Sequence, residues 1–335
     1  MVGCLRPSPD DRVGTGMRDN IYCVFCVLLT LALAALGMRY VTELWIFSFF
    51  FSLQLQISLI VLVGILLCLL VKRGVYVWIL LAVCLALIGH SLWMKREFVA
   101  SPLPAEAIAN APRLRILSFN ILNDNVENAG KIADMIQGSQ ADVVYIMEAN
   151  PLFGELDRLG ETYPYRIGCG IETPTCDLMM LSKHPIRAGR YDELSDLRAD
   201  RFAEIEIEVA GRKISLLAAH VSKPYFDDYH SIEMDNLILG LNDAKGSVIL
   251  AGDFNSDSIA PDMQRFLRRS GLRKVGPEPA TWPVEAGVAG IAIDHIFIGK
   301  EFAPLSLKRL DESYGSNHFG LVADVALIGE AEPDN

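Results

Sequence analysis

Residues 247–258 read SVILAGDFNSDS, in which a short apolar run leads directly into Asp253 and Asn255. The length and composition of the run predict a buried β-strand. A buried strand that ends in an acid and, two residues later, an amide brings polar groups to the rim of its sheet. The stretch therefore predicts a sheet whose edge carries a polar site.

Apolar runs of the same kind recur along the chain, and turn residues flank them. Seven further strands are expected: LRILSFNIL (114–122), DVVYIMEA (142–149), DLMMLS (177–182), FAEIEIEV (202–209), KISLLAAHV (213–221), AIDHIFIG (292–299) and FGLVADVAL (319–327). Helices are expected over 125–138, 229–243 and 261–270. The simplest arrangement of these elements is an α/β sandwich, with strands in two layers and helices outside.

Nearly every expected strand delivers a polar side chain to one end. These residues are Asn120, Glu148, His220, Asp253 with Asn255, Asp294, and the stretch SNH at 316–318. If the strand ends meet at one edge, they form a single cleft that holds carboxylates, carboxamides and two histidines. The alternative for each residue is a structural role without chemistry, for example in an Asx turn or as a solvent-exposed carboxylate.

The residue types in this cleft favour one kind of chemistry. The chain has too few histidines and cysteines there for a typical zinc site. Glu148, Asp253 and Asn120 are hard oxygen donors that suit Mg²⁺ or Mn²⁺, and such an ion most often serves phosphate chemistry. No serine in a nucleophile elbow and no glycine-rich GK[ST] loop is present. Direct attack by activated water is therefore favoured over a covalent intermediate.

The N-terminal third of the chain has a different composition. Three apolar runs, at 21–37, 44–71 and 75–93, approach or exceed the roughly 20 residues that cross a bilayer. We expect membrane-spanning helices at about 21–38, 44–71 and 75–93, the second tilted or starting in the interface with the aromatic cluster 45–51. A cleaved signal peptide at the first run is disfavoured, because no small-residue cleavage pattern follows it and two more runs come next.

Basic residues predict the orientation in the membrane. Five of them belong on the cytoplasmic side if the spans alternate: Arg6, Arg12 and Arg18 in the segment 1–20, and Lys72 and Arg73 between the second and third runs. Lys95 and Arg96 argue mildly the other way. Three crossings place the C-terminal domain outside the cytoplasm, in the periplasm of an inner (plasma) membrane protein. We expect an extended linker at 94–111 and a tail at 329–335.

The cysteines fit this division of the chain. Four of them, Cys23, Cys26, Cys68 and Cys84, lie in the apolar runs, so the CxxC spelling at 23–26 is not taken as a metal or redox site. Cys169 and Cys176 lie in the expected domain. Two alternatives stay open for this pair: a disulfide, as in an oxidising compartment, or two free thiols.

Six short motifs, taken together and in order, carry a resemblance to a known family. LSFNIL, VYIMEAN, AAHVSKP, LAGDFNSD, AIDHIFI and GSNHFGLVADV resemble the motif series of the endonuclease/exonuclease/phosphatase (DNase I-like) superfamily. Membrane-anchored bacterial members are the nearer likeness. The resemblance covers about residues 112–328 and implies a four-layer α/β sandwich with Mg²⁺- or Mn²⁺-dependent phosphoester hydrolysis.

The resemblance also implies roles for individual residues. Asn120 and Glu148 match the family's metal ligands. Asp253 matches the residue that orients and deprotonates the attacking water, and it is also expected to be a metal ligand. Asn255 matches the residue that holds the phosphate or that water.

The two histidine motifs complete the implied site. His220 matches a hydrogen-bond donor to a phosphate oxygen. His318, paired with Asp294, matches the group that stabilises the charge of the transition state. The family's last motif usually reads Ser-Asp-His, whereas this chain has Asn317 in the middle position. This departure removes a carboxylate near the metal and leaves open whether one or two ions bind.

The substrate stays open between several alternatives. A nuclease needs basic groups at the cleft, yet residues 105–335 hold 22 Lys/Arg and 36 Asp/Glu. The densest basic patch is RFLRRSGLRK at 265–274. A nuclease-like phosphodiesterase is the first prediction. The membrane anchor offers the competing alternative of a phosphatase or phospholipase-type diesterase on lipid headgroups, with Tyr225 and Phe226 in a loop that faces the substrate or only packs. A non-catalytic, membrane-anchored binding protein is the third alternative, and no protein partner is indicated.

Overall fold

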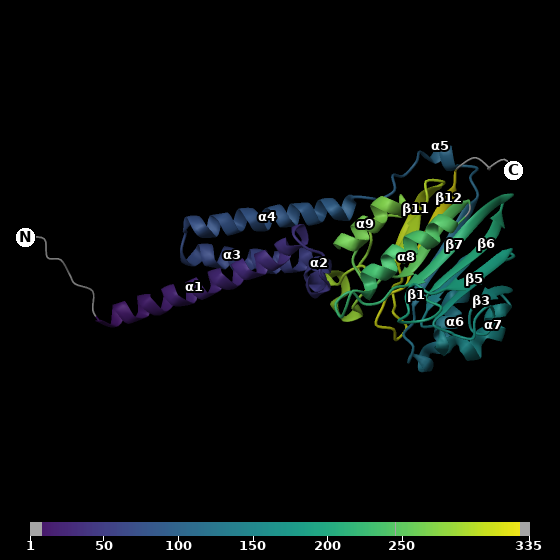
Figure 1. The fold of residues 1–335 in the computed structure, drawn as a ribbon, viewed down its shortest axis with the longest axis horizontal. Coiled ribbons are helices and arrows are strands. Elements are labelled where there is room, and N and C mark those ends of the chain that lie inside the picture. The colour runs from purple at the N-terminus through teal and green to yellow at the C-terminus, as the bar shows by residue number, and fades with distance from the viewer. Residues whose placement is uncertain (1–8, 245, 329–335) are drawn as a thin grey trace, which may run out of the picture.

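A bundle of long helices and an α/β sandwich at one end of that bundle make up the chain (Figure 1). The computed structural model describes residues 9–244 and 246–328. The first eight residues of the expected N-terminal segment, and the expected tail at 329–335, lie outside the described residues.

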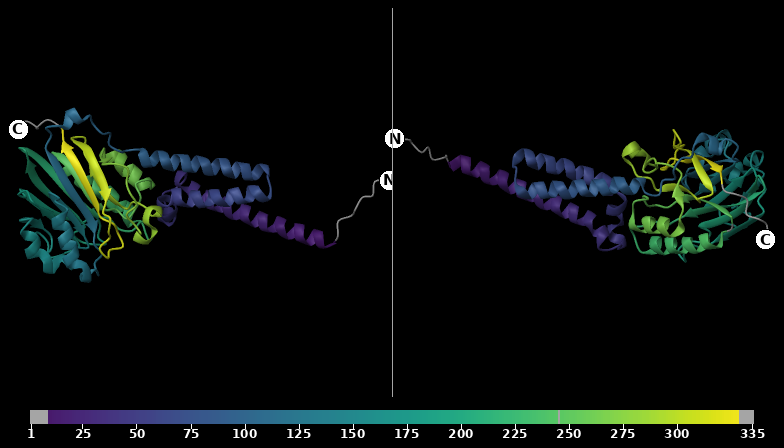
Figure 2. Two further views of the ribbon diagram at one scale, coloured as in Figure 1. Left: turned by 180° about the vertical axis from the view of Figure 1, so that it is seen from behind. Right: turned by 90° about the horizontal axis from the view of Figure 1, so that it is seen from above.

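The bundle contains three helices that are long and apolar enough to cross a membrane: α1 (Pro9–Gly37), α3 (Gln54–Val71) and α4 (Val75–Arg96). Large apolar side chains such as Ile60 and Leu70 are exposed on the outside of the bundle, as lipid-facing helices require. Lys72 forms an ion pair with Asp19 at 3.4 Å. The turn between α3 and α4 therefore lies beside the early part of α1, at the end of the bundle away from the sandwich (Figures 1 and 2).

The second expected span is interrupted. Residues 44–71 were expected to form either one tilted helix or a helix preceded by an interfacial aromatic cluster at 45–51. The structure has two short helices, η2 (Trp45–Phe47) and α2 (Ser48–Ser52), before α3 begins at Gln54. A further short helix, η1 (Met38–Tyr40), follows α1. The break has a packing cause, because Phe51 of α2 is buried against the sandwich instead of facing lipid.

Two six-stranded sheets form the centre of the sandwich. The first sheet has the order β11-β12-β1-β2-β4-β3. Its strands are β1 (Arg113–Asn120), β2 (Val143–Met147), β3 (Tyr165–Ile167), β4 (Leu178–Ser182), β11 (Phe302–Arg309) and β12 (Leu321–Leu327). Only the β1–β2 pair among these is parallel.

The second sheet has the order β5-β6-β7-β8-β10-β9. Its strands are β5 (Ala188–Asp192), β6 (Phe202–Val209), β7 (Arg212–His220), β8 (Ser247–Asp253), β9 (Arg273–Lys274) and β10 (Asp294–Ile298). The parallel pair here is β7–β8. The carboxyl ends of two strands in each sheet therefore point the same way, which gathers polar residues at one edge.

Helices cover the outer face of each sheet and complete four layers (Figure 1). The first sheet is covered by α6 (Ala129–Gly138) and α7 (Leu156–Gly160), with the short η3 (Val126–Asn128) and η4 (Asn150–Glu155) beside them. The second is covered by α8 (Tyr229–Asp243) and α9 (Pro261–Ser270). Apolar side chains between the sheets, such as Ile116 and Ile249, form the central core. The expected α/β sandwich is confirmed.

Parts of the expected linker at 94–111 pack as structure. Helix α4 continues to Arg96, and Phe98 and Ala100 exchange backbone hydrogen bonds with Lys274, so the chain adds to the edge strand β9. The short helix α5 (Ala105–Ile108) follows. The short helix η5 (Val284–Ala289) precedes β10. The bundle is thus joined to the sandwich by a short and partly ordered connection, not by a freely extended tether.

Gly252, which precedes Asp253 in β8, must be glycine for a steric reason. Its φ is +152°, and a Cβ placed on it would lie 1.9 Å from the carbonyl oxygen of Ala219. We expect Gly252→Ala to push β8 away from β7 and to cost about 3 kcal/mol of stability. Thermal unfolding of the full chain in detergent should show a Tm lower by roughly 10 °C. Gly138→Ala, where no atom lies within 4 Å, is the control, and an equal Tm for both variants would contradict the expectation.

Candidate active site

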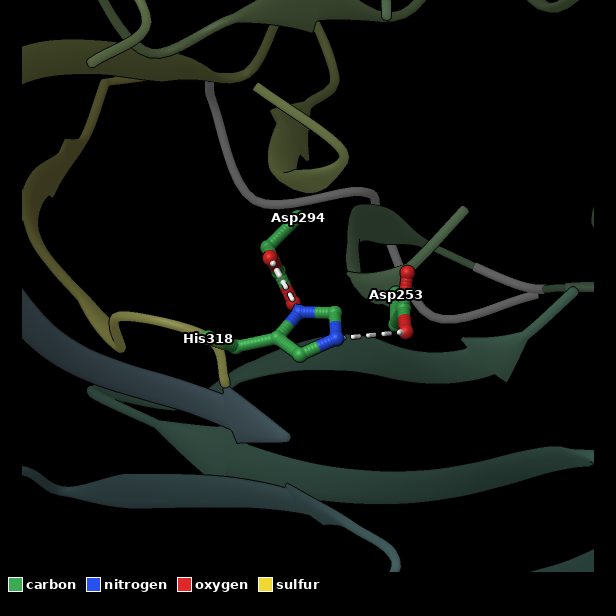
Figure 3. Close-up of side chains that lie close together, drawn as sticks. All are labelled: Asp253, Asp294 and His318. Carbon is green, nitrogen blue, oxygen red and sulfur yellow. Dashed lines mark hydrogen bonds and ion pairs between the residues drawn. The ribbon is translucent and has the colours of Figure 1, made fainter. Parts of the chain in front are cut away.

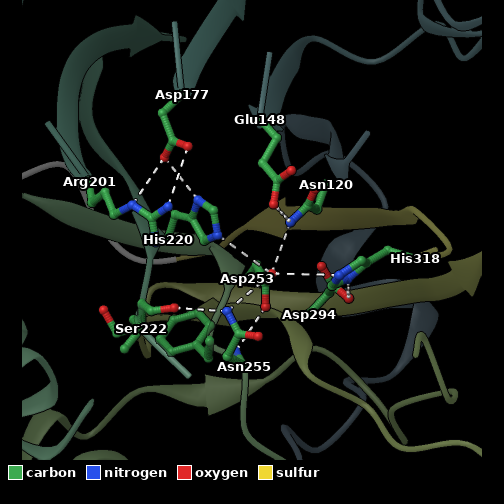
Figure 4. Close-up of polar contacts among 12 residues, drawn as sticks. Asn120, Glu148, Asp177, Arg201, His220, Ser222, Asp253, Asn255, Asp294 and His318 are labelled. Atoms are coloured by element: carbon green, nitrogen blue, oxygen red, sulfur yellow. Dashed lines mark hydrogen bonds and ion pairs between the residues drawn. The ribbon is translucent and has the colours of Figure 1, made fainter. Parts of the chain in front are cut away.

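Strand direction explains why the polar residues meet. Asp253 at the end of β8 is in register with His220 at the end of β7 and with Asp294 at the start of β10. In the other sheet, Asn120 ends β1 and Glu148 follows β2 directly. The two edges face each other across the sandwich, and the polar groups converge there (Figure 4).

Asp253 lies at the centre of the site and is 1% exposed. Its Oδ2 accepts a hydrogen bond from Asn120 Nδ2 at 3.0 Å. The same oxygen lies 3.8 Å from Nε2 of His220 and 3.8 Å from Nε2 of His318. Its Oδ1 accepts the backbone N–H of Asn255 at 2.8 Å. A carboxylate held in this way has one fixed orientation between two imidazoles.

His318 and Asp294 form the first of two histidine–aspartate pairs (Figure 3). His318 Nδ1 lies 2.9 Å from Asp294 Oδ2, and both side chains are buried. Burial alone lowers the pKa of His318, but the carboxylates of Asp294 and Asp253 outweigh it and raise the pKa to about 9. At neutral pH this imidazole is therefore protonated and donates from both ring nitrogens.

The second pair joins His220 to Asp177, a residue that the sequence analysis did not select. His220 Nδ1 lies 2.9 Å from Asp177 Oδ2, and Arg201 Nε lies 3.3 Å from the same oxygen. Although burial raises the pKa of Asp177, the hydrogen bond from His220 and the charge of Arg201 lower it below its usual value. Asp177 directly precedes β4, whose start lies beside the end of β2. The sequence signal that could have identified Asp177 is an acid at the start, not the end, of an apolar run.

Oxygen donors gather on the other side of Asp253. Glu148 is half-buried, its Oε1 accepts from Asn120 Nδ2 at 3.2 Å, and its Oε2 accepts the Asn123 backbone N–H at 2.7 Å. Asn317 lines the same pocket, and its buried Oδ1 has no hydrogen-bond partner. A buried acceptor without a partner is costly, and a cation would satisfy it. The oxygens of Glu148, Asp253 and Asn317 therefore fit a hard divalent ion. Asn120 presents its Nδ2 to the two carboxylates, and its Oδ1 accepts the Leu122 N–H.

Distances alone would allow a second metal site. One ligand atom from each of Asp253, Asp294 and His318 lies within 4.8 Å of the others. The hydrogen bond between His318 Nδ1 and Asp294 Oδ2 leaves only His318 Nε2 and Asp294 Oδ1 for an ion.

All residues selected from the strand ends lie in one region, and most line a single pocket of about 690 Å³. Pocket residues include Glu148, His220, Asp253, Asn255, Asn317 and His318. Asn120 and Asp294 lie directly behind it and bond to Asp253 and His318. Asn255 adopts a φ of +51°, and its Nδ2 donates to the carbonyl of Val221 at 2.9 Å. This contact fixes the turn that follows β8.

The structure also answers two questions from the sequence, the state of the cysteine pair and the position of the basic patch. The sulfur atoms of Cys169 and Cys176 are bonded in the structure. The basic face of α9 is paired with acids: Arg265 with Glu43, Arg268 with Glu97 and Arg269 with Asp235. The patch at 265–274 therefore faces the bundle and α8 instead of the cleft.

These features define a DNase I-like α/β sandwich with a polar cleft at the common edge of its two sheets. Residues 117–318 match the Endonuclease/Exonuclease/phosphatase family, and the chain belongs to this family. Its members are generally phosphoester hydrolases. No curated protein is significantly similar in sequence.

Solved structures share the fold at low identity. An endonuclease/exonuclease/phosphatase from Beutenbergia cavernae is 17% identical, with a TM-score of 0.52 over 65% of this chain and 72% of that chain. A family protein from Leptotrichia buccalis is 19% identical, with a TM-score of 0.52 over 63% and 99%. D. rerio TDP2 complexed with single strand DNA product is 16% identical, with a TM-score of 0.51 over 64% and 98%. At these identities the likeness concerns the fold.

Proposed function

We propose that the chain is a membrane-anchored hydrolase that cleaves a phosphoester, most simply a phosphodiester, by direct attack of water with the help of Mg²⁺ or Mn²⁺. The observation that carries the proposal is Asp253, a buried carboxylate with one oxygen 3.8 Å from each of two imidazoles, each of which is oriented by an aspartate. A carboxylate that can act as a general base and two oriented imidazoles thus face one small space.

Each residue has a role that follows from its contacts. Asp253 orients the water and accepts its proton. His318, protonated at neutral pH, donates Nε2–H to a phosphoryl oxygen where negative charge builds up. His220 places its Nε2 beside another oxygen of the same group, and the contact of its Nδ1 with Asp177 fixes the orientation of the ring. Asn255 holds the turn that positions Asp253 and presents its amide to the phosphate.

The metal ion has a defined place in this proposal. The ion would be held by Glu148, Asp253, Asn317 and Asn120. The side-chain oxygen Oδ1 of Asn120 has a second lone pair besides the one that accepts the Leu122 N–H. When bound, a divalent ion neutralises phosphoryl charge and stabilises the leaving oxygen. Asn317 supplies a neutral oxygen in place of a carboxylate, which weakens attraction for a second cation and favours a single ion.

The cellular setting is part of the proposal. The α3–α4 turn with Lys72 and Arg73 lies at the end of the bundle away from the sandwich. With this basic turn in the cytoplasm, the domain lies on the far side of the inner membrane, in the periplasm. The disulfide between Cys169 and Cys176 is in keeping with an oxidising compartment.

Metal removal tests the proposal. We expect the full chain in detergent to hydrolyse bis(p-nitrophenyl) phosphate with Mg²⁺ or Mn²⁺, and to lose this activity with EDTA until the ion is restored. Glu148→Gln should raise the Mg²⁺ concentration needed for half-maximal rate by about ten-fold or more, because a metal-binding carboxylate is lost. The control is Glu127→Gln on η3. Metal-independent turnover would refute the role of the ion. No turnover of any phosphoester together with no binding of Mg²⁺ would refute the proposal in favour of a non-catalytic binding protein.

A further inference from the structure

The pocket around Asp253 has one wall that the sandwich does not supply. Its deep part is formed by catalytic residues, and one side by the segment 222–227. The facing side is lined by Ser48, Phe49, Ser52 and Leu53, which belong to α2 and the residue after it. A part of the chain that lies between two membrane spans therefore borders the catalytic cleft.

Contacts of α2 itself fix this wall in place. Phe51 is 2% exposed and packs in the same apolar cluster as Phe254, the residue between Asp253 and Asn255. Ser52 Oγ lies 3.3 Å from Ser256 Oγ. The wall is thus attached directly to the turn that carries the proposed general base.

Neighbouring parts of the bundle hold the same side of the sandwich. Arg39 donates to the carbonyl of Ile259 at 2.8 Å, and Gln56 Nε2 donates to the carbonyl of Gly290 at 2.9 Å. Lys95 forms an ion pair with the buried Asp257 at 3.0 Å. These contacts come from all three spans or their ends, so the cleft has a constant position relative to the bundle.

The wall also lies beside the sandwich-side ends of the proposed spans. Helix α1 ends at Gly37 and α3 begins at Gln54, so α2 lies between the sandwich-side ends of two spans (Figures 1 and 2). Large apolar side chains on this connection are exposed, including Ile46 at 60% and Phe49 at 53%. Exposed aromatic and aliphatic residues beside spans are typical of the membrane interface.

The pocket changes from polar to apolar toward this surface. Its depth holds carboxylates and imidazoles, whereas its mouth holds Phe49, Leu53 and, on the opposite side, Phe226, which is 68% exposed. The cationic side chains of Arg198 and Lys223 also line it. An anionic headgroup at the catalytic residues and an apolar part at the mouth would match this gradient.

A nucleic acid fits the same surroundings less well. The basic residues of α9 are paired with acids, as described above, and the domain carries an excess of acidic groups. The bundle borders one side of the cleft, which leaves less room for a long polyanion. Charge and shape therefore both favour a substrate that comes from the bilayer.

We infer that α2 is a specificity element and that the substrate is a phosphoester of a membrane lipid. This inference rests on the proposed function. The lipid stays in the outer leaflet beside α2, its phosphate reaches Asp253 and His318, and its apolar part contacts Phe49, Leu53 and Phe226. A water oxygen forms a bond to phosphorus, the ester P–O bond breaks, and the water's proton passes to Asp253. The leaving oxygen takes a proton from solvent and departs as an alcohol.

The experiment uses the full chain reconstituted in vesicles of phosphatidylethanolamine, phosphatidylglycerol and phosphatidic acid, with Mg²⁺. Release of headgroup, phosphate or diacylglycerol is measured beside hydrolysis of bis(p-nitrophenyl) phosphate and of a single-stranded oligonucleotide. We expect lipid hydrolysis that Asp253→Asn abolishes. Phe49→Ser and Phe226→Ser should each lower the ratio of the lipid rate to the soluble diester rate at least ten-fold.

The matched control is Phe153→Ser, an exposed phenylalanine of η4 outside the pocket, which should leave the ratio unchanged. Metal-dependent cleavage of the soluble diester without cleavage of lipid would overturn the inference and leave the proposed function standing. So would a clear preference for the oligonucleotide, or a ratio that Phe49→Ser and Phe226→Ser do not change. An absence of any metal-dependent hydrolysis by the wild type would overturn both the inference and the proposed function.

Discussion

Asp253→Asn should lower kcat by about 10³-fold or more while the protein stays folded. A positioned general base alone contributes 10²- to 10⁴-fold, and Asp253 is also placed in the metal set. Asparagine has the same shape, and its side-chain oxygen can still accept the Asn255 backbone N–H. Its amide nitrogen would then face Asn120, whose hydrogen bond to Oδ2 is lost unless the Asn120 amide turns. The substituted side chain cannot take a proton from water at neutral pH. We therefore expect a large loss of rate with a Tm within a few degrees of the wild type.

The measurement is hydrolysis of bis(p-nitrophenyl) phosphate by the full chain in detergent, with thermal unfolding of the same samples. Asp134→Asn, an exposed aspartate of α6 that pairs with Arg158, is the control and should keep wild-type activity. If Asp253→Asn keeps more than a tenth of the rate, Asp253 is not the general base. If it loses rate and unfolds as well, Asn255→Ala distinguishes a disordered turn from lost chemistry, because it removes the hydrogen bond to Val221 but keeps the carboxylate.

Strand patterns predicted the central part of the fold. The runs that became β1, β2, β7 and β8 are mostly apolar where they are buried on both faces, so length and composition were sufficient. The same runs ended in the polar residues of the site, because parallel strands bring their carboxyl ends to one edge. Convergence of Asn120, Glu148, His220 and Asp253 was thus predictable from the sequence.

Edge strands could not be predicted in the same way. Strand β5 has the sequence AGRYD and is largely exposed, and β11 contains Pro304 and an irregular register beside it. Neither has the buried apolar run that identified the central strands. Strands β3 and β9 are three and two residues long and carry no pattern.

Two parts of the site depend on contacts between distant segments. Asp177 is recognisable only when β4 is known to lie beside β2, since nothing near it in sequence marks it as the partner of His220. The position of α2 depends on Phe51 packing into the apolar cluster that contains Phe254, about 200 residues away, whereas hydropathy alone places Phe51 in or beside a lipid-facing span. Long-range packing, not local preference, decides both.

His318→Asn should lower kcat by about a thousand-fold with little change in KM. Its Nε2–H is placed to stabilise charge that is larger in the transition state than in the bound substrate, and removal of such a donor costs 10² to 10³ in rate. Hydrolysis of the soluble diester measures the effect, and His184→Asn, a half-buried histidine outside the pocket, is the control. A rise in KM at unchanged kcat would instead give His318 a role in substrate binding only.

The pH dependence separates this role from a structural one. The protonated form of His318 is the donor, and its pKa is raised to about 9 because the carboxylates of Asp294 and Asp253 outweigh burial. The donor is lost as pH rises, so kcat/KM of the wild type should fall on the alkaline side. A cation at Asp253 and Glu148 offsets part of their charge, so this fall should begin below the value of about 9 that applies without the ion. Asp294→Asn removes the leading cause of the raised pKa and should move this alkaline limb to lower pH. An alkaline limb that keeps its position in Asp294→Asn would assign it to another group.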